Sequence, residues 1–141
     1  MSVTRSQIVA QARTWKGTPY EHQGRTKGVR VDCVGLLIGV AHELGLSSFD
    51  YLDYGQSPDG DMMTRLLSSH MRHLNSWKDA LPGDVLHIAF SAKRRPQHLA
   101  IVVAPGRIIH AYSSHKKVVE HRLDDDWRLL IRDAYSFFEV N

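Results

Sequence analysis

The sequence predicts an α+β fold. Segments in the first 74 residues place apolar side chains at helical spacing, whereas segments after Pro82 are short, rich in Val and Ile, and separated by turn residues. Helical segments followed by strands are the order of an α+β protein. The chain has 141 residues, the usual size of one domain, and no repeat, low-complexity tract or linker divides it. We expect residues 1–141 to form a single domain, with helices packed on an antiparallel sheet of about five strands.

The helices follow from apolar periodicity and from their end signals. Thr4-Arg5-Ser6-Gln7 has the form of a capping box, and Gly45 is placed as a C-cap after a segment that is apolar nearly all round. The expected helices are Arg5 to Trp15, Cys33 to Leu44 and Asp61 to Leu74. Residues 17–32 contain three glycines and one proline, which predicts a long ordered loop. Loops of this length are often functional.

The strands follow from alternation between turn signals. The expected strands are Val85 to Phe90, His98 to Val103, Arg107 to Tyr112, Val118 to Arg122 and Ala134 to Val140. In the second of them, alternation places His98, Ala100 and Val102 on one face of the sheet and Leu99, Ile101 and Val103 on the other. The apolar helix that begins at Cys33 is expected to lie across one of these faces.

Composition and charge exclude several classes of protein. The chain is 43% hydrophobic and 23% charged, with a formal net charge of +3, which is far from the clustered basicity of a nucleic-acid binder. Its longest apolar run, from Val34 to Ala41, is too short to span a membrane. Residues 1–15 lack the uninterrupted apolar stretch of a signal peptide. We therefore expect synthesis in the cytoplasm, no membrane span and no nucleic-acid partner.

Cys33 is the single cysteine, so an intramolecular disulfide and a multi-cysteine metal site are excluded. It lies in Asp32-Cys33-Val34-Gly35, where a loop enters the apolar helix. The free N–H groups and partial positive charge of a helix N-terminus favour a thiolate, lower the cysteine pKa and offer donors to a developing oxyanion. Cys33 is therefore a candidate nucleophile; the alternative is a small buried core residue.

Two histidines are placed to serve a thiol nucleophile. His98 begins a strand, and a turn at Ala104-Pro105-Gly106 would pair this strand with the next and bring His110 beside His98. The second ring could then orient the first through its other nitrogen and fix its tautomer. In the loop before the helix, His22 follows Tyr20 closely and is expected to line the same cleft. Each histidine taken alone is more often a surface or satisfied core residue.

The other histidines indicate less. His70 and His73 lie at i, i+3 in the expected third helix, which could hold a metal, but no further ligand stands at supporting spacing. A metal site formed by Cys33, His98 and His110 is a weaker alternative to a nucleophile with its base, and we expect no metal or other cofactor. His121 has no sequence context beyond that of a surface residue.

Several blocks resemble, in order, the NlpC-type cell-wall cysteine peptidases. They are Thr18-Pro19-Tyr20, Asp32-Cys33-Val34-Gly35-Leu36, Pro82-Gly83-Asp84-Val85-Leu86, His98-Leu99-Ala100-Ile101-Val102 and Ile108-Ile109-His110-Ala111. The resemblance covers about residues 4–140, and its specific part is the ordered set with twelve residues from His98 to His110. The segment from Gly17 to Gln23, with a loop that ends in Asp-Cys-Val-Gly, is especially similar to the branch found in the tail modules of phages and gene transfer agents.

The resemblance implies a papain-like fold and a cysteine endopeptidase. Cys33 would be the nucleophile, His98 the general base and acid, His110 the residue that orients His98, and Tyr20 a donor near the oxyanion. The implied substrate is the peptidoglycan stem peptide, cut between D-glutamate and a diamino acid. Many members have Ser or Ala after the cysteine where this chain has Val34, which changes the adjoining subsite. Related folds also act as amidases or acyltransferases on other amides and lipids.

The resemblance also implies partners and a place of action. The chain has no repeat module that binds the cell wall, so a phage tail or gene-transfer-agent tail would carry it to the periplasm or wall. The alternative is a structural tail-assembly protein that retains an inactive peptidase fold and an unreactive thiol.

Overall fold

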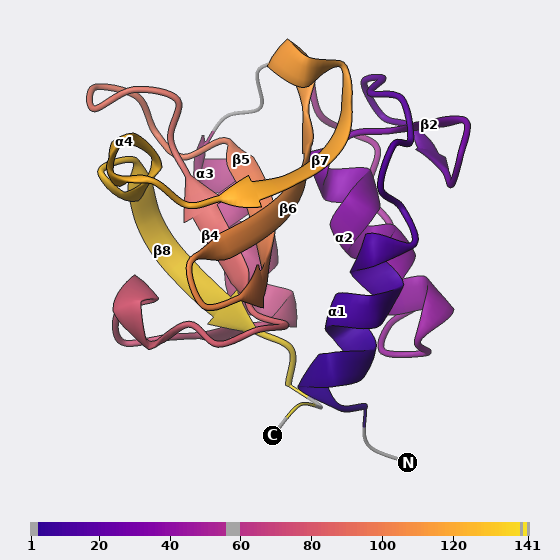
Figure 1. Ribbon diagram of the computed structural model, residues 1–141, viewed down its shortest axis with the longest axis horizontal. Helices are drawn as coiled ribbons and strands as arrows, with labels where there is room; N and C mark the ends of the chain where they lie inside the picture. Colours follow the sequence, from indigo (N-terminus) through magenta and orange to yellow (C-terminus); the bar gives the residue numbers. More distant parts are fainter. Residues whose placement is uncertain (1–2, 56–59, 139, 141) are drawn as a thin grey trace.

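The computed structural model describes residues 3–55, 60–138 and 140 (Figure 1). The helices are α1 (Arg5–Arg13), α2 (Cys33–Glu43), α3 (Gly60–His70) and α4 (Asp125–Arg128), with short 3₁₀ turns η1 (Trp77–Asp79) and η2 (Ser113–His115). The strands are β1 (Arg25–Thr26), β2 (Arg30–Val31), β3 (Arg72–His73), β4 (Val85–Ile88), β5 (His98–Ala104), β6 (Arg107–Tyr112), β7 (Lys117–Arg122) and β8 (Ile131–Ser136). The predicted α+β class is therefore confirmed.

One antiparallel sheet organises the molecule. Its strand order is β3-β8-β4-β5-β6-β7, and β1 and β2 form a separate two-stranded ribbon in the loop before α2. In Figure 1, α1 and α2 lie side by side next to the sheet and α3 lies behind it.

The two faces of the sheet bury separate apolar layers. The first layer joins α1, α2 and α3 to one face, and it contains Leu99, Ile101 and Val103 of β5. The second layer, which contains Ala100 and Val102, lies on the other face under η1 and α4. The alternation predicted along β5 is confirmed for residues 99–103, and His98 lies at the end of this strand, next to Leu99.

The start of α1 is as the sequence predicts. The Thr4 hydroxyl accepts from the Gln7 N–H at 3.1 Å, and the Thr4 N–H donates to the Gln7 side chain at 2.8 Å. The helix ends at Arg13, two residues before the predicted Trp15, whose ring packs on α2 where Gly39 leaves room. A Cβ atom at Gly39 would lie 2.3 Å from that ring, so the two helices need glycine here to pack this closely.

The largest differences from the predicted elements are in the third helix and the last strand, and the strand predicted as Val85 to Phe90 ends at Ile88. The third helix ends at His70 rather than Leu74, because Arg72 and His73 leave it to pair with β8 as β3. The last strand is Ile131–Ser136 rather than Ala134 to Val140, and Glu139 of the predicted strand lies outside the described residues. With β3 included, the main sheet has six strands among the described residues, one more than expected.

The acidic segment before Trp127 forms the start of the short helix α4. Asp124 caps the short helix α4 by accepting the Trp127 N–H at 3.0 Å. This cap turns the Trp127 side chain toward the second apolar layer, where it packs as a partly buried residue.

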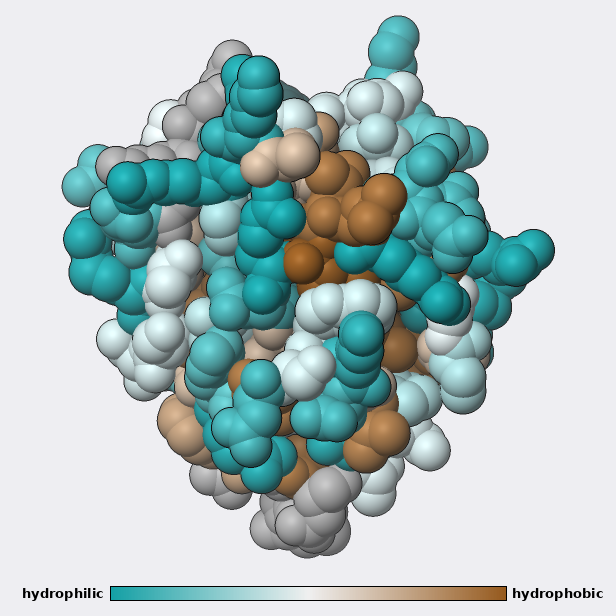
Figure 2. Space-filling model, turned by 90° about the vertical axis from the view of Figure 1, so that its left-hand side faces the viewer, coloured by the Kyte–Doolittle hydropathy of each residue, from teal (hydrophilic) through white to brown (hydrophobic). Residues whose placement is uncertain are grey.

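The surface combines charged cover with local apolar exposure. Figure 2 shows apolar side chains gathered among hydrophilic ones on the side of the molecule that carries α4 and β8. Large exposed apolar residues include Phe90 and Leu129, with 41% and 76% exposure. Within the described residues, none of the helices is long and apolar enough to cross a membrane.

Candidate functional site

Asp32 fixes the start of α2. As the N-cap residue it accepts the Gly35 N–H at 2.7 Å, which satisfies one of the free donors of the first helical turn. Its buried carboxylate also accepts the Gln23 N–H at 2.8 Å and the Tyr54 hydroxyl at 2.6 Å, and it pairs with Arg25 at 3.1 Å. One carboxylate therefore ties residues 23–25 and Tyr54 to the helix start, next to Cys33.

The first turn of α2 packs against this loop backbone to backbone. A Cβ atom at Gly35 would lie 2.1 Å from the Gly24 carbonyl oxygen, closer than any side chain can approach. The glycine in Asp32-Cys33-Val34-Gly35 thus allows the loop to lie against the helix and keeps the Cys33 backbone in place.

Cys33 is half-buried and lies where α2 meets β5. Burial raises the pKa of its thiol to about 12, and the Asp32 carboxylate raises it further, against the backbone N–H groups of Leu99, Val34 and Cys33, which lower it. The sequence-based expectation of a lowered pKa is therefore wrong: the helix-start donors are present, but desolvation and a neighbouring negative charge outweigh them. The resting sulfur is a neutral thiol.

His98 and His110 come together on β5 and β6. The His98 Nε2 and the His110 Nδ1 are 2.6 Å apart. Both rings are buried, and burial lowers the pKa of His98 to about 3 and that of His110 to about 2, with further lowering from neighbouring histidines. Both rings are therefore neutral near pH 7. Leu99, whose N–H acts on the Cys33 sulfur, directly follows His98, so the thiol lies at the strand end that carries this pair.

His121 extends the pair into a chain of three rings. The His110 Nε2 lies 2.8 Å from the His121 Nε2, and the His121 Nδ1 lies 2.8 Å from the Arg122 carbonyl oxygen. Trp127 of α4 packs on both rings, with centroid separations of 5.2 Å to His110 and 5.5 Å to His121. The expectation that His121 is only a surface residue is wrong; alternation along β7, paired with β6, was the signal that could have placed it on this face.

Tyr20 lies close to the thiol, whereas His22 does not join the other histidines. Burial raises the pKa of Tyr20 to about 12, and the nearby Cys33 and Asp32 raise it further, so its hydroxyl stays protonated. The backbone holds it there: the Tyr20 N–H donates to the Lys116 carbonyl at 2.9 Å. The His22 ring packs on the Tyr54 ring with a centroid separation of 5.3 Å, and the Tyr54 hydroxyl donates to Asp32.

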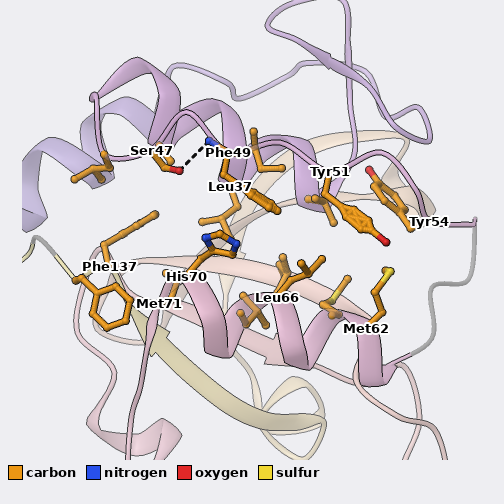
Figure 3. Close-up of a pocket in the computed structure, with 18 residues that line it drawn as sticks. Leu37, Ser47, Phe49, Tyr51, Tyr54, Met62, Leu66, His70, Met71 and Phe137 are labelled. Carbon is orange, nitrogen blue, oxygen red and sulfur yellow. Dashed lines mark hydrogen bonds between the residues drawn. The ribbon is translucent and has the colours of Figure 1, made fainter.

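An apolar pocket of about 200 Å³ opens beside the helix start, between α2 and α3 (Figure 3). Leu37, Phe49 and Tyr51 point into it from one side, and Met62, Leu66 and Met71 point into it from the other. Val34 and Leu99, which flank the thiol along the chain and across to β5, also line it. A ligand with an apolar group could therefore reach from this pocket to Cys33.

The two histidines that the sequence offers as possible metal ligands, His70 and His73, lie in different elements. His70 ends α3 with its ring 4.0 Å from that of Phe49, while His73 lies in β3 and its Nε2 is 2.9 Å from Asp133. They do not share a helix, contrary to the prediction. Over residues 3–55, 60–138 and 140, no group of three His, Cys, Asp or Glu side chains could hold a metal ion.

These features define a papain-like class of protein: a thiol at the start of a central helix, packed against an antiparallel sheet that carries neutral, hydrogen-bonded histidines. The model of the NlpC/P60 family matches residues 17–128, and the chain belongs to this family. The matched span runs from the loop that carries Tyr20 to the last residue of α4 and contains every site residue described above.

Solved structures agree with this fold. An NlpC/P60 family protein from Bacillus cereus aligns with a TM-score of 0.74 at 16% identity, over 97% of this chain and 41% of the other. The NlpC/p60 domain of the peptidoglycan hydrolase SagA aligns at 0.67 and 22% identity, over 96% and 100%. NlpC2 from Trichomonas vaginalis aligns at 0.71 and 17%, over 97% and 48%. The chain thus spans less than half of two of these proteins. No curated protein matches it.

Proposed function

We propose that the chain is a phage-type cell-wall cysteine endopeptidase that hydrolyses peptide bonds in peptidoglycan stem peptides. The observation that carries the proposal is the 2.6 Å contact between His98 and His110. It lies at the end of β5 where the backbone of Leu99 contacts the Cys33 sulfur. Membership of the NlpC/P60 family and the likeness in fold to a peptidoglycan hydrolase support the choice of substrate.

The proposed mechanism starts from a neutral thiol and a neutral imidazole. The His98 Nε2 is occupied by His110, so the His98 Nδ1 is the nitrogen left to take the Cys33 proton as the sulfur attacks the carbonyl carbon. The Cys33 N–H and the Tyr20 hydroxyl stabilise the oxyanion. His98 then protonates the leaving amine, and water hydrolyses the thioester with His98 as the base.

The finer part of the proposal comes from the sequence blocks. The bond cut is the one between D-glutamate and the diamino acid, and the partners are phage-tail or gene-transfer-agent tail proteins that carry the enzyme from its site of synthesis to the periplasm or wall. Many family members have Ser or Ala at the position of Val34. Because Val34 lines the apolar pocket next to the nucleophile, we propose that this pocket is the subsite whose shape the valine changes.

Digestion of purified peptidoglycan tests the activity. The wild-type protein is expected to release new amino groups, with the cut bond identified by mass spectrometry of the fragments. Cys33→Ala and His98→Ala are expected to lose release, while His42→Ala, which removes an exposed histidine of α2, keeps it. Release by Cys33→Ala equal to that by wild type would rule out the proposal.

A second candidate is a structural tail protein with an inactive peptidase fold. The raised pKa of Cys33 favours it, because a neutral thiol is a poor nucleophile unless a base assists it. Alkylation by iodoacetamide at pH 7 separates the two candidates. An active site gives faster alkylation in wild type than in His98→Ala; a structural protein gives equally slow alkylation in both.

A further inference from the structure

The chain of rings runs from the buried His98 and His110 to the partly exposed His121, and it ends at a group that can only accept a hydrogen bond. The Arg122 carbonyl has no proton to give, so the His121 Nδ1, 2.8 Å away, must be the protonated nitrogen of that ring. A neutral imidazole carries one proton. In the neutral form of the His121 ring, the Nε2 is therefore bare and accepts.

The same reasoning passes along the chain. Since the His121 Nε2 accepts, the His110 Nε2 at 2.8 Å must donate, which leaves the His110 Nδ1 bare. The His98 Nε2, 2.6 Å from that nitrogen, must then donate in its turn. In the neutral state the His98 Nδ1 is left without a proton, and this nitrogen is the one that His110 does not occupy.

We propose that His121 is a positioning residue that sets the tautomer of His98 through His110, so that the His98 Nδ1 is free to accept the Cys33 proton. This proposal deepens the proposed function and rests on it for its catalytic meaning. The role assigned to His110, that of orienting His98, requires His110 to have a fixed tautomer of its own, and the contact with His121 supplies it.

The surroundings favour a fixed chain over a surface contact. His110 is fully buried and His98 is 3% exposed, so bulk water does not compete for their ring nitrogens. Trp127 packs edge-on to His110 and covers His121, and Tyr112 stacks on His110 at 4.9 Å. A buried donor or acceptor left without its partner here costs free energy. We therefore expect the hydrogen bonds from His98 through His110 to His121 to keep one donor-to-acceptor order.

Two substitutions at His121 separate the possible directions of the hydrogen bonds: one keeps the wild-type direction and the other reverses it. In His121→Gln the amide oxygen can accept from the His110 Nε2, which keeps the direction of the wild type. In His121→Lys the ammonium can only donate, so the His110 Nε2 must accept, its Nδ1 must donate, and His98 must carry its proton on Nδ1. His115→Gln is the control, because this exposed ring stacks on Tyr112 and lies outside the chain of contacts.

The test is a nitrogen-proton correlation spectrum of the ring nitrogens of ¹⁵N-labelled protein at pH 7, assigned by single histidine substitutions. We expect a protonated Nε2 on His98 and His110 in wild type, His121→Gln and His115→Gln, and a protonated Nδ1 on His98 in His121→Lys. A wild-type His98 protonated on Nδ1 overturns the proposal, and so does a folded His121→Lys variant whose His98 tautomer is unchanged. If this variant does not fold, the wild-type spectrum still decides.

Kinetics with a synthetic stem peptide supply the second readout. We expect His121→Gln to retain kcat within a factor of about three, and His121→Lys to lose kcat by on the order of 10² to 10⁴ with KM unchanged. A protein with the expected tautomers but no cleavage by wild type refutes the proposed function and leaves the tautomer assignment standing. Cleavage by wild type with an unexpected tautomer refutes the assignment alone.

Discussion

At the scale of single residues, Asp32 acts in two opposed ways. Its carboxylate caps α2 and gathers the loop around the helix start, yet its negative charge raises the pKa of the neighbouring thiol. The resting site is therefore neutral, and its reactivity depends on proton transfer to His98 as the sulfur attacks. A pre-formed thiolate is not required for this order of events.

Asp32→Asn separates these two effects. We expect the pKa of Cys33 to fall, because the carboxylate charge is gone, and the free energy of unfolding to drop by about 1–3 kcal/mol, because Arg25 and Tyr54 lose a buried charged partner. The pH dependence of Cys33 alkylation and urea denaturation measure the two quantities.

Asp50→Asn is the matched control, since Asp50 pairs with the same Arg25 at 3.0 Å but does not act on Cys33. Its Cys33 pKa should stay at the wild-type value. Equal Cys33 pKa values in wild type and Asp32→Asn would contradict the role given to the carboxylate.

Tyr20→Phe tests the second oxyanion donor. The substitution keeps the ring that packs on the first apolar layer and removes the hydroxyl, whose pKa the nearby Cys33 helps to raise. We expect kcat on a stem peptide to fall by on the order of 10-fold to 10³-fold with KM little changed, because the lost bond strengthens only in the transition state. A fall in stability without any fall in kcat would assign Tyr20 to packing alone. Tyr51→Phe, on the wall of the pocket, is the control.

The sequence predicts part of this site and misses the rest for physical reasons. The contact between His98 and His110 follows from two strands and a short turn, which are local features. The position of His121 depends on the register of β7 against β6. The pKa of Cys33 depends on its burial and on the nearby Asp32 carboxylate, whose orientation cannot be read from sequence spacing. Both are set by tertiary packing.

At the scale of elements, the first turn of α2 is the part whose placement the site needs most. Gly35→Ala gains roughly 1 kcal/mol in helix propensity. The new Cβ would lie 2.1 Å from the Gly24 carbonyl oxygen, however. The backbone of either α2 or the loop would have to move, which costs free energy. We expect a net loss of about 1–3 kcal/mol in unfolding free energy, together with a loss of activity as the turn shifts.

Gly55→Ala is the control for this prediction, because among the described residues beyond its chain neighbours no atom lies within 4 Å of the added Cβ. Thermal denaturation and stem-peptide cleavage measure both variants. A Gly35→Ala protein as stable and active as Gly55→Ala would show that the loop can move away from α2.

The elements that sequence patterns predict best are those with many periods. The helix from Cys33 and the alternation along β5 extend over enough residues to be recognised, whereas β3 has two residues and is defined only by its pairing with β8. Likewise, α4 has four residues and depends on its Asp124 cap and on Trp127 packing under the sheet. Such short elements carry no periodicity of their own.

At the scale of the whole molecule, neutral histidines are buried on both faces of the sheet. His98 and His110 lie on the face under α4, and His87 of β4 pairs with Leu99 in the layer under the helices. His87 is fully buried, and neither ring nitrogen has a hydrogen-bond partner among the described residues. Burial lowers its pKa to about 4, although the charge of Asp133, 3.8 Å away, and the backbone of Pro96 both act in the opposite direction.

These lowered pKa values predict that acid destabilises the fold. A histidine with a pKa near 6.5 in the unfolded chain and about 4 in the folded one binds protons more readily when unfolded, so its stabilising effect is full above pH 6.5 and is lost as pH falls toward 4. For His87 this loss is about 2 kcal/mol between pH 7.5 and pH 5. Urea denaturation at the two pH values should show His87→Leu losing less stability than wild type by that amount, while His42→Leu, at an exposed position, follows wild type. The same pH dependence in His87→Leu and wild type would mean that His87 titrates alike in the folded and unfolded chain, and the acid sensitivity would then rest on His98 and His110.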